Sequence, residues 1–126
     1  MRVIIESSPE AASRLAADLV ARLVQAKPDA VLGLATGSTP ERLYQELIRR
    51  HREEKLSFAR VTTFNLDEYV GLPPGHPQSY RSFMQRTLFN HIDIEPSRTF
   101  IPDGHALDLY AACRAYEQKI RDIGGI

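Results

Sequence analysis

Short apolar runs alternate with amphipathic stretches along the whole chain. Runs with the length and composition of strands fall at four places, of which the last is the weakest, namely residues 3–5, 30–35, 61–66 and 98–101. Apolar residues at three- and four-residue spacing predict helices after residue 8, after residue 39, after residue 79 and over about residues 106–123. The chain therefore predicts strands and helices in regular alternation.

Three of the predicted helices have recognisable start signals. Ser8 and Thr39 can each cap a helix whose first residue is a proline, Pro9 or Pro40. Ser79 supplies a similar cap for the third helix. The inward face predicted for the first helix consists of Leu15, Ala16, Leu19, Val20, Leu23 and Val24, and that of the last helix contains Leu109, Cys113, Tyr116 and Ile120.

This alternation is typical of right-handed strand–helix–strand units. It predicts an α/β fold, a doubly wound (Rossmann-like) parallel sheet with flanking helices, and the continuous apolar run at 30–35 predicts a strand covered on both faces. The pattern stops at residue 126, where a further strand would begin. We therefore expect a sheet that is incomplete at its C-terminal end, with residues 1–126 forming the N-terminal portion of a single domain.

The composition of the chain excludes several classes of protein. A chain of 126 residues with 43% hydrophobic and 25% charged residues is neither disordered nor collagenous nor a disulfide scaffold. Sixteen basic and sixteen acidic residues give zero net charge, which offers no bulk attraction for nucleic acid or for an anionic membrane. With one cysteine, no membrane-spanning run and an apolar start too short for a signal peptide, we expect a cytoplasmic protein.

The turn after residues 30–35 is the first candidate site. Thr36, Gly37, Ser38 and Thr39 combine three hydroxyls with a glycine that allows close approach to the backbone, and they precede a helix N-terminus. Such a turn can hold a phosphate without a lysine, and it is neither a Walker A nor a GxGxxG sequence. The alternative is a plain strand-to-helix turn in which Thr39 only caps the helix.

The second candidate site follows residues 61–66 and opens a long loop. Asp67 and Glu68 are adjacent carboxylates, so their side chains should diverge, one acting as a general base and the other holding the loop or a backbone amide. The alternative is a solvated acidic turn. Tyr80 begins the next helix beside this loop, so its hydroxyl can reach a ligand even though its spacing also fits the core.

The remaining reactive residues predict little chemistry. The four histidines lie far apart, and none has metal-ligand spacing to another histidine or to the cysteine, so we expect no metal. Cys113 is predicted to be a small core residue of the last helix.

Three segments together resemble the glucosamine-6-phosphate deaminase family. They are Leu-Ala-Thr-Gly-Ser-Thr-Pro at residues 34–40, Thr-Phe-Asn-Leu-Asp-Glu-Tyr-Val-Gly-Leu-Pro at 63–73, and His-Pro-Gln-Ser-Tyr at 76–80 followed by Ser-Phe-Met at 82–84. Related 6-phosphogluconolactonases have a similar Gly-Ser-Thr-Pro turn but a different sequence after the later strand, so the second segment favours the deaminase.

The resemblance implies an activity and its residues. The reaction would convert glucosamine 6-phosphate to fructose 6-phosphate with release of ammonia and without a cofactor, and we class it with the hydrolases. Residues Thr36, Gly37, Ser38 and Thr39 would contact the sugar phosphate, Asp67 would be the base that moves a proton between C2 and C1, and Glu68 and Tyr80 would support substrate binding.

The resemblance also implies what residues 1–126 lack. No histidine here matches the ring-opening histidine of the family, so we expect the chain to depend on residues that follow it. Two other functions stay open, a non-catalytic sugar-phosphate sensor and, ranked last, a lactonase. Whether the chain forms a homo-oligomer is left open by the sequence.

Overall fold

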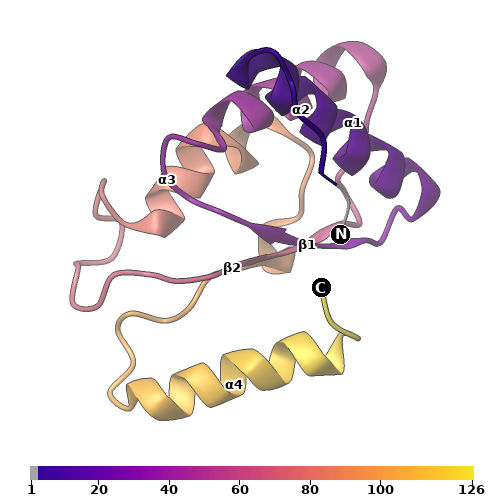
Figure 1. The fold of residues 1–126 in the computed structure, drawn as a ribbon. Helices are drawn as coiled ribbons and strands as arrows, with labels where there is room; N and C mark the ends of the chain where they lie inside the picture. Colours follow the sequence, from indigo (N-terminus) through magenta and orange to yellow (C-terminus); the bar gives the residue numbers. More distant parts are fainter. Residues whose placement is uncertain (1–2) are drawn as a thin grey trace.

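A computed structural model describes residues 3–126 and contains a small parallel sheet with helices on both faces (Figure 1). The elements are α1 (Pro9–Ala26), β1 (Val31–Leu34), α2 (Glu41–Glu54), β2 (Thr62–Asn65), α3 (Tyr80–Thr87), β3 (Thr99–Phe100) and α4 (Leu109–Asp122), with short 3₁₀ helices at Phe89–His91 and Pro96–Arg98. The strand order is β1-β2-β3, and both pairings are parallel. The predicted doubly wound class is confirmed.

The two faces of the sheet are covered by unequal numbers of helices. Helices α1, α2 and α3 lie on one face and α4 lies on the other (Figure 1). All four residues of the central strand β2 are buried. The core lies between the sheet and the three-helix layer, and its largest members include Tyr44, Leu47, Phe58 and Met84. The chain buries its apolar side chains mainly on this face, which makes it the rigid support for the strand ends.

Helix α1 begins at its predicted start signal, but the residues that it buries differ from the predicted inward face. The Ser8 hydroxyl accepts a hydrogen bond from the Ala11 amide, as a capping serine does. The buried residues are Ala17, Ala21 and Val24, whereas Leu19 and Leu23 are exposed. The predicted apolar face is therefore wrong at these two leucines, because the small alanines let α1 approach its neighbour closely.

Helix α2 begins one residue later than its start signal predicts. Pro40 is the N-cap, and no side chain of the described residues caps the helix. The prediction that Thr39 caps α2 is therefore wrong. Its buried face contains Tyr44 and Leu47, as predicted from their spacing.

Two predictions about the strands are also wrong. Residues 3–5, all within the described chain, form no strand and are exposed, since a strand persists only where a neighbour pairs with its backbone. β1 lies at an edge of the sheet, and Gly33 is exposed, so this strand is not covered on both faces. The strand covered on both faces is β2.

Helix α4 is attached to the sheet by few contacts. Tyr116 packs edge-on against Phe64, and the Lys119 ammonium lies 4.3 Å from the centre of the Phe100 ring. Every residue of α4 is described and none is buried, and Cys113 is exposed. The prediction of Cys113 as a core residue is therefore wrong, because the helix meets the sheet only through one narrow face.

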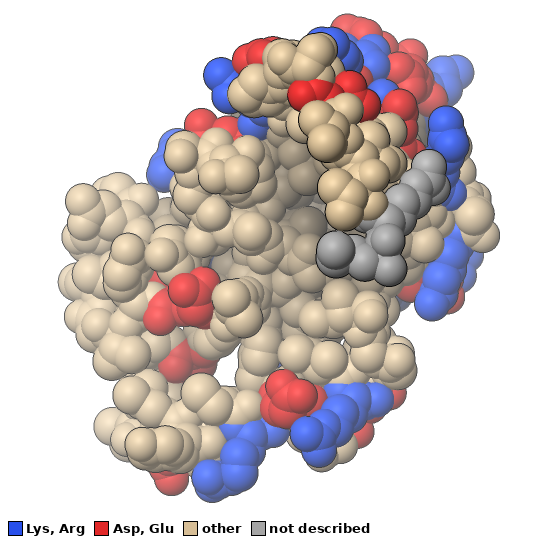
Figure 2. All heavy atoms as spheres, in the orientation of Figure 1, with Lys and Arg blue, Asp and Glu red and all other residues tan. Residues whose placement is uncertain are grey.

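Charged side chains gather away from the strand ends. Figure 2 shows basic and acidic side chains interleaved over α1 and α2 and again along α4, whereas the side carrying the loop after β2 is mostly uncharged apart from a small acidic group. No helix within residues 3–126 has the length and apolar composition needed to cross a membrane.

Candidate functional site

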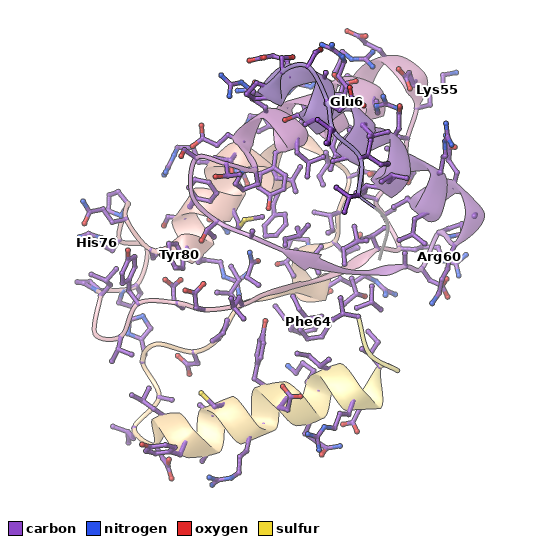
Figure 3. All side chains as sticks on the ribbon, viewed as in Figure 1. Glu6, Lys55, Arg60, Phe64, His76 and Tyr80 are labelled. Carbon is purple, nitrogen blue, oxygen red and sulfur yellow. The ribbon has the colours of Figure 1, made fainter. Side chains whose placement is uncertain are left out.

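The predicted site segments lie together at the carboxyl ends of β1 and β2. β1 leads into the turn at residues 36–39, and β2 leads into Leu66 and Asp67. Figure 3 shows Tyr80 and His76 at this end of the sheet, while Lys55 and Arg60 lie toward the opposite end. In an open parallel sheet this edge is where ligands bind.

The turn after β1 leaves its backbone accessible. Gly37 has a φ of +90°, a conformation that glycine adopts without strain, and an added Cβ there would meet no atom within 4 Å. Thr36 is half-buried, whereas Ser38 and Thr39 are exposed. The Glu41 amide donates to the Ser38 carbonyl at 3.4 Å, but no side chain of residues 3–126 caps α2, so the next amides, those of Arg42 and Leu43, remain available to an anion.

The two adjacent carboxylates differ in their surroundings. Asp67 is exposed two residues beyond the end of β2. Glu68 turns back onto the start of α3, where its Oε1 accepts hydrogen bonds from the Tyr69 amide at 2.9 Å and the Tyr80 amide at 2.8 Å. Its Oε2 accepts a third, from the Arg81 amide at 2.9 Å. One carboxylate is thus free for chemistry, and the other holds the helix that carries Tyr80.

Tyr80 connects the two candidate segments. Its hydroxyl lies 3.4 Å from that of Tyr69, and the two ring centroids are 4.8 Å apart. The hydrogen bond with Tyr69 and partial burial raise the pKa of Tyr80, the Asp67 carboxylate raises it further, and the Thr36 hydroxyl lowers it. Residues of both candidate segments, Thr36 and Asp67, thus influence the pKa of the Tyr80 phenol.

The long loop after β2 is fastened to the segment that follows β3. The Gly71 amide donates to the Gly104 carbonyl at 3.1 Å. A Cβ on Gly104 would lie 2.1 Å from the Tyr69 carbonyl oxygen, so only glycine fits there. A cleft of about 320 Å³ lies between these segments, with Glu68, Arg81 and His105 in its wall.

Two buried side chains, those of Tyr44 and Asn65, donate hydrogen bonds to main-chain carbonyls at the end of β1. The sequence analysis did not predict this role. The Tyr44 hydroxyl donates to the Ala35 carbonyl, and the Asn65 side-chain amide donates to the Leu34 carbonyl at 2.9 Å. Burial raises the pKa of Tyr44 well above its usual range. The available signal was Asn65 itself, a polar residue that ends an apolar strand.

The histidines have separate partners. His51 Nδ1 lies 2.7 Å from the Leu56 carbonyl oxygen, His91 Nε2 lies 3.0 Å from the Arg86 carbonyl oxygen, and His76 Nδ1 accepts from the Gln78 amide at 3.2 Å. Within residues 3–126, no three histidine, cysteine or acidic side chains lie close enough to hold a metal ion. Arg81 binds the Thr99 carbonyl and hydroxyl.

The fold and this site define a class of protein, a doubly wound α/β protein with an accessible Gly-Ser-Thr turn and an exposed carboxylate at the same edge of its sheet. Residues 6–125 match the family model for glucosamine-6-phosphate isomerases/6-phosphogluconolactonase, and the chain belongs to this family.

Similar proteins agree with this assignment. The chain is 60% identical over 126 residues to glucosamine-6-phosphate deaminase of Hahella chejuensis and 50% identical to glucosamine-6-phosphate deaminase 2 of Bacillus subtilis. All of the chain aligns in both cases, with 48% and 51% of those proteins covered. The chain therefore spans about half the length of the curated relatives it matches.

Solved structures show the same relationship. A structure of a monomeric glucosamine-6-phosphate deaminase superposes with a TM-score of 0.96 at 51% identity, over 99% of this chain and 52% of that one. The 6-phosphogluconolactonase of Thermotoga maritima superposes with a TM-score of 0.71 at 22% identity, over 96% of this chain and 53% of that one. The second likeness is one of fold alone.

The classification of the chain with the hydrolases is wrong. Its relatives are named deaminases, and the family description calls glucosamine-6-phosphate enzymes isomerases. Isomerisation of an aldose to a ketose moves a proton between two carbons, which is not a hydrolytic step.

Proposed function

We propose that the chain belongs to an enzyme that converts glucosamine 6-phosphate to fructose 6-phosphate and ammonia. The observation that carries the proposal is the parallel pairing of β1 and β2, which ends at Leu34 and Asn65 and so brings the turn at 36–39 and the exposed Asp67 carboxylate to the same edge of the sheet. The 60% identity to a named deaminase supports the same substrate.

The turn and the first amides of α2 would bind the phosphate. Backbone N–H groups and the hydroxyls of Thr36, Ser38 and Thr39 offer donors, and a helix N-terminus favours a negative charge. Binding the phosphate there would direct the other end of an open-chain sugar along the crevice toward Asp67. The negative charge of the phosphate would then lie away from the negative charge of the Asp67 carboxylate.

Asp67 would be the base of the isomerisation. It would take the proton from C2 and return it to C1, which turns the 2-amino aldose into an imine at C2. One solvent water then adds to this C=N bond, so that C2 becomes the ketone carbonyl and the nitrogen leaves as ammonia. An aspartate is a weak base toward a carbon acid, so the step needs a polarised C1 and an oriented carboxylate. Glu68 and Tyr80 would supply orientation, Glu68 through the three amides it holds.

The test uses the gene product at its full length. We expect ammonia release from glucosamine 6-phosphate, and we expect Asp67→Asn to lower kcat by about 100- to 10,000-fold because the base is lost. Binding of fructose 6-phosphate, measured by calorimetry, should change by no more than about threefold, since the phosphate supplies most of the attraction.

Asp103→Asn is the matched control. Asp103 is an exposed carboxylate of the neighbouring loop whose Oδ1 accepts from the His105 amide, and an asparagine oxygen can do the same. Its activity should equal that of the wild type. Sugar-phosphate binding without any turnover by the wild type would favour the sensor function, and unchanged turnover by Asp67→Asn would remove Asp67 from the role of base.

We also propose a small sugar phosphate as the ligand, the N-terminal portion of a single α/β domain for residues 1–126 and the cytoplasm as the location. The single cysteine, Cys113, is exposed as a free thiol, which suits a reducing compartment. The balanced charge gives no support to a nucleic-acid or membrane partner.

A further inference from the structure

Side-chain donors bind main-chain carbonyls at the carboxyl ends of all three strands. We call the three residues that do so, Tyr44, Asn65 and Tyr116, the strand-end clasp. Tyr44 donates to Ala35, Asn65 donates to Leu34, and the Tyr116 hydroxyl lies 2.7 Å from the Asn65 carbonyl and 3.1 Å from the Phe100 carbonyl. The clasp holds strands together at the edge where they diverge.

Asn65 is the member that joins the two strands of the candidate site. Leu34 and Asn65 are the last paired residues of β1 and β2. Beyond them one strand enters the turn at 36–39 and the other enters the loop that begins with Leu66 and Asp67. The 2.9 Å bond from Asn65 Nδ2 to the Leu34 carbonyl therefore adds a link where backbone pairing ends.

The buried position of Asn65 requires an explanation. Its exposed fraction is 2%, and its Oδ1 is buried without a hydrogen-bond partner among residues 3–126. A buried acceptor without a partner destabilises the fold, whereas a leucine of similar size would leave no polar group unsatisfied. The amide is thus poorly suited to packing alone, and the bond to Leu34 is the one contribution that an apolar side chain cannot replace.

The hydrogen bond between Asn65 and Leu34 lies close to both candidate segments of the site. Leu34 precedes Thr36 by two residues, and Asn65 precedes Asp67 by two residues. Two residues reach at most about 7 Å along the chain, so both candidate segments are held close to the bond. The segments themselves make no other strand-to-strand pairing beyond this register within the described residues.

We propose that Asn65 is a positioning residue that sets the separation between the turn at 36–39 and the Asp67 carboxylate. It is buried and does not contact the substrate. This inference rests on the proposed function, in which the turn holds the phosphate while Asp67 acts at the far end of the sugar. A fixed separation would then match the length of an open-chain hexose phosphate.

The first experiment compares Asn65→Leu with Thr63→Val in the full-length gene product. Thr63 lies on the same strand, is 2% exposed, and its hydroxyl also lacks a partner among residues 3–126, so it is a matched control for removing a buried polar group. We expect Asn65→Leu to lower kcat by about 10- to 100-fold, as misplacement of a reacting group does. The Kd for inorganic phosphate should stay within about twofold, because the turn itself is intact.

Each outcome of this comparison decides the inference. Equal kcat values for Asn65→Leu and Thr63→Val would overturn it and leave the proposed function intact. A wild-type protein that releases no ammonia from glucosamine 6-phosphate would overturn the proposed function and this inference with it. A loss of phosphate affinity equal to the loss of kcat would assign Asn65 to the turn alone and would also overturn it.

Asn65→Asp provides a second test that does not depend on the leucine variant folding. A protonated carboxyl group can donate to the Leu34 carbonyl, whereas an ionised one cannot, and burial raises the pKa of such a carboxyl group. We expect the ratio of variant kcat to wild-type kcat to rise as the pH falls from about 8 to about 5.5. A ratio that does not change with pH would overturn the inference.

The neighbouring titratable groups are the same in both proteins. Asp67 follows Asn65 by two residues, and Glu117 of α4 lines the same cavity as Asn65. Burial raises the pKa of Tyr44 and brings that of Tyr116 to about 12, so both phenols stay neutral in this range. Arg81 donates to the Thr99 carbonyl on β3 at 3.2 Å and is common to both proteins.

Discussion

Asp67 and Glu68 are adjacent in the sequence, and their surroundings give them different tasks. Asp67 is exposed at the strand end, while Glu68 accepts hydrogen bonds from the first two amides of α3 and from the neighbouring Tyr69 amide. A carboxylate at a helix N-terminus stabilises the amides that the helix itself leaves unpaired. The substrate-binding role predicted for Glu68 therefore remains a prediction, and its observed partners belong to the protein backbone.

Replacement of Glu68 should destabilise the protein. Glu68→Ala leaves the amides of Tyr80 and Arg81 without this acceptor, and we expect the free energy of unfolding to fall by about 1–3 kcal/mol. Glu68→Gln keeps one oxygen acceptor and should lose less. Urea unfolding of both variants measures the difference. Glu95→Ala, which removes an exposed glutamate whose side chain caps nothing, serves as the control, and equal stabilities for Glu68→Ala and Glu95→Ala would contradict the capping role.

At the scale of elements, Asp93 connects the segment after α2 to the segment before β3. Its carboxylate accepts from the Ser57 hydroxyl and the Phe58 amide, each at 2.6 Å. Burial raises the pKa of Asp93, but the hydrogen bonds from Ser57 and Phe58 and the nearby His51 outweigh it and hold the pKa below its usual value. These bonds fix the chain just ahead of β2.

The lowered pKa predicts a loss of stability in acid. A group whose pKa is lower in the folded state stabilises the fold above its unfolded pKa, near 4, and this contribution is lost as the pH falls through the folded value. The side chain is 37% exposed, so after solvent screening we expect about 1 kcal/mol or less. Between pH 5 and pH 3 the wild type should lose more stability than Asp93→Asn in thermal unfolding. A parallel loss in both would count against this role.

Gly104 limits how the two loops beside the site can pack. Because an added Cβ would lie 2.1 Å from the Tyr69 carbonyl oxygen, Gly104→Ala must displace the loop after β2. We expect the free energy of unfolding to fall by about 1–3 kcal/mol, measured by chemical denaturation. At Gly33 an added Cβ would lie 3.3 Å from the Ile126 side chain, which can move, so Gly33→Ala should change stability by less than about 0.5 kcal/mol. Equal effects would contradict this packing argument.

At the scale of the whole molecule, the helices on the two faces of the sheet differ in how completely they are buried. Tyr44 and Leu47 of α2 are each 1% exposed, whereas α4, described throughout, has no buried residue. Segments with few buried apolar contacts open more often than the core. The α4 layer should therefore open without the rest of the fold.

Amide hydrogen exchange of the 126-residue chain tests this expectation. We expect the amides of α4 to exchange about tenfold or more faster than those of α2. Tyr116→Phe removes the hydroxyl that binds the Asn65 and Phe100 carbonyls, and it should speed exchange in α4 without changing α2. Similar protection in the two helices would show that α4 and the core open as one unit.

Local signals in the sequence predicted most of the fold and part of the site. Ser8 and Ser79 cap the helices that follow them, and the apolar runs at 30–35 and 61–66 contain β1 and β2. The turn at 36–39 and Asp67 were predicted as site residues because a parallel sheet brings the ends of neighbouring strands together. These features depend on residues within a few positions of each other or on the general geometry of the fold.

Tertiary structure alone decided which side chains are buried and what they bind. Periodicity marks an apolar face, but it cannot show that alanines of α1 face the core while Leu19 is exposed, or that α4 leaves Cys113 in solvent. The roles of Glu68 and Asn65 depend on amides and carbonyls 12 and 31 residues away. The sequence by itself therefore determined the elements and the candidate residues at the strand ends, because short-range spacing encodes them. The partners that orient this chemistry depend on long-range packing, which no local pattern records.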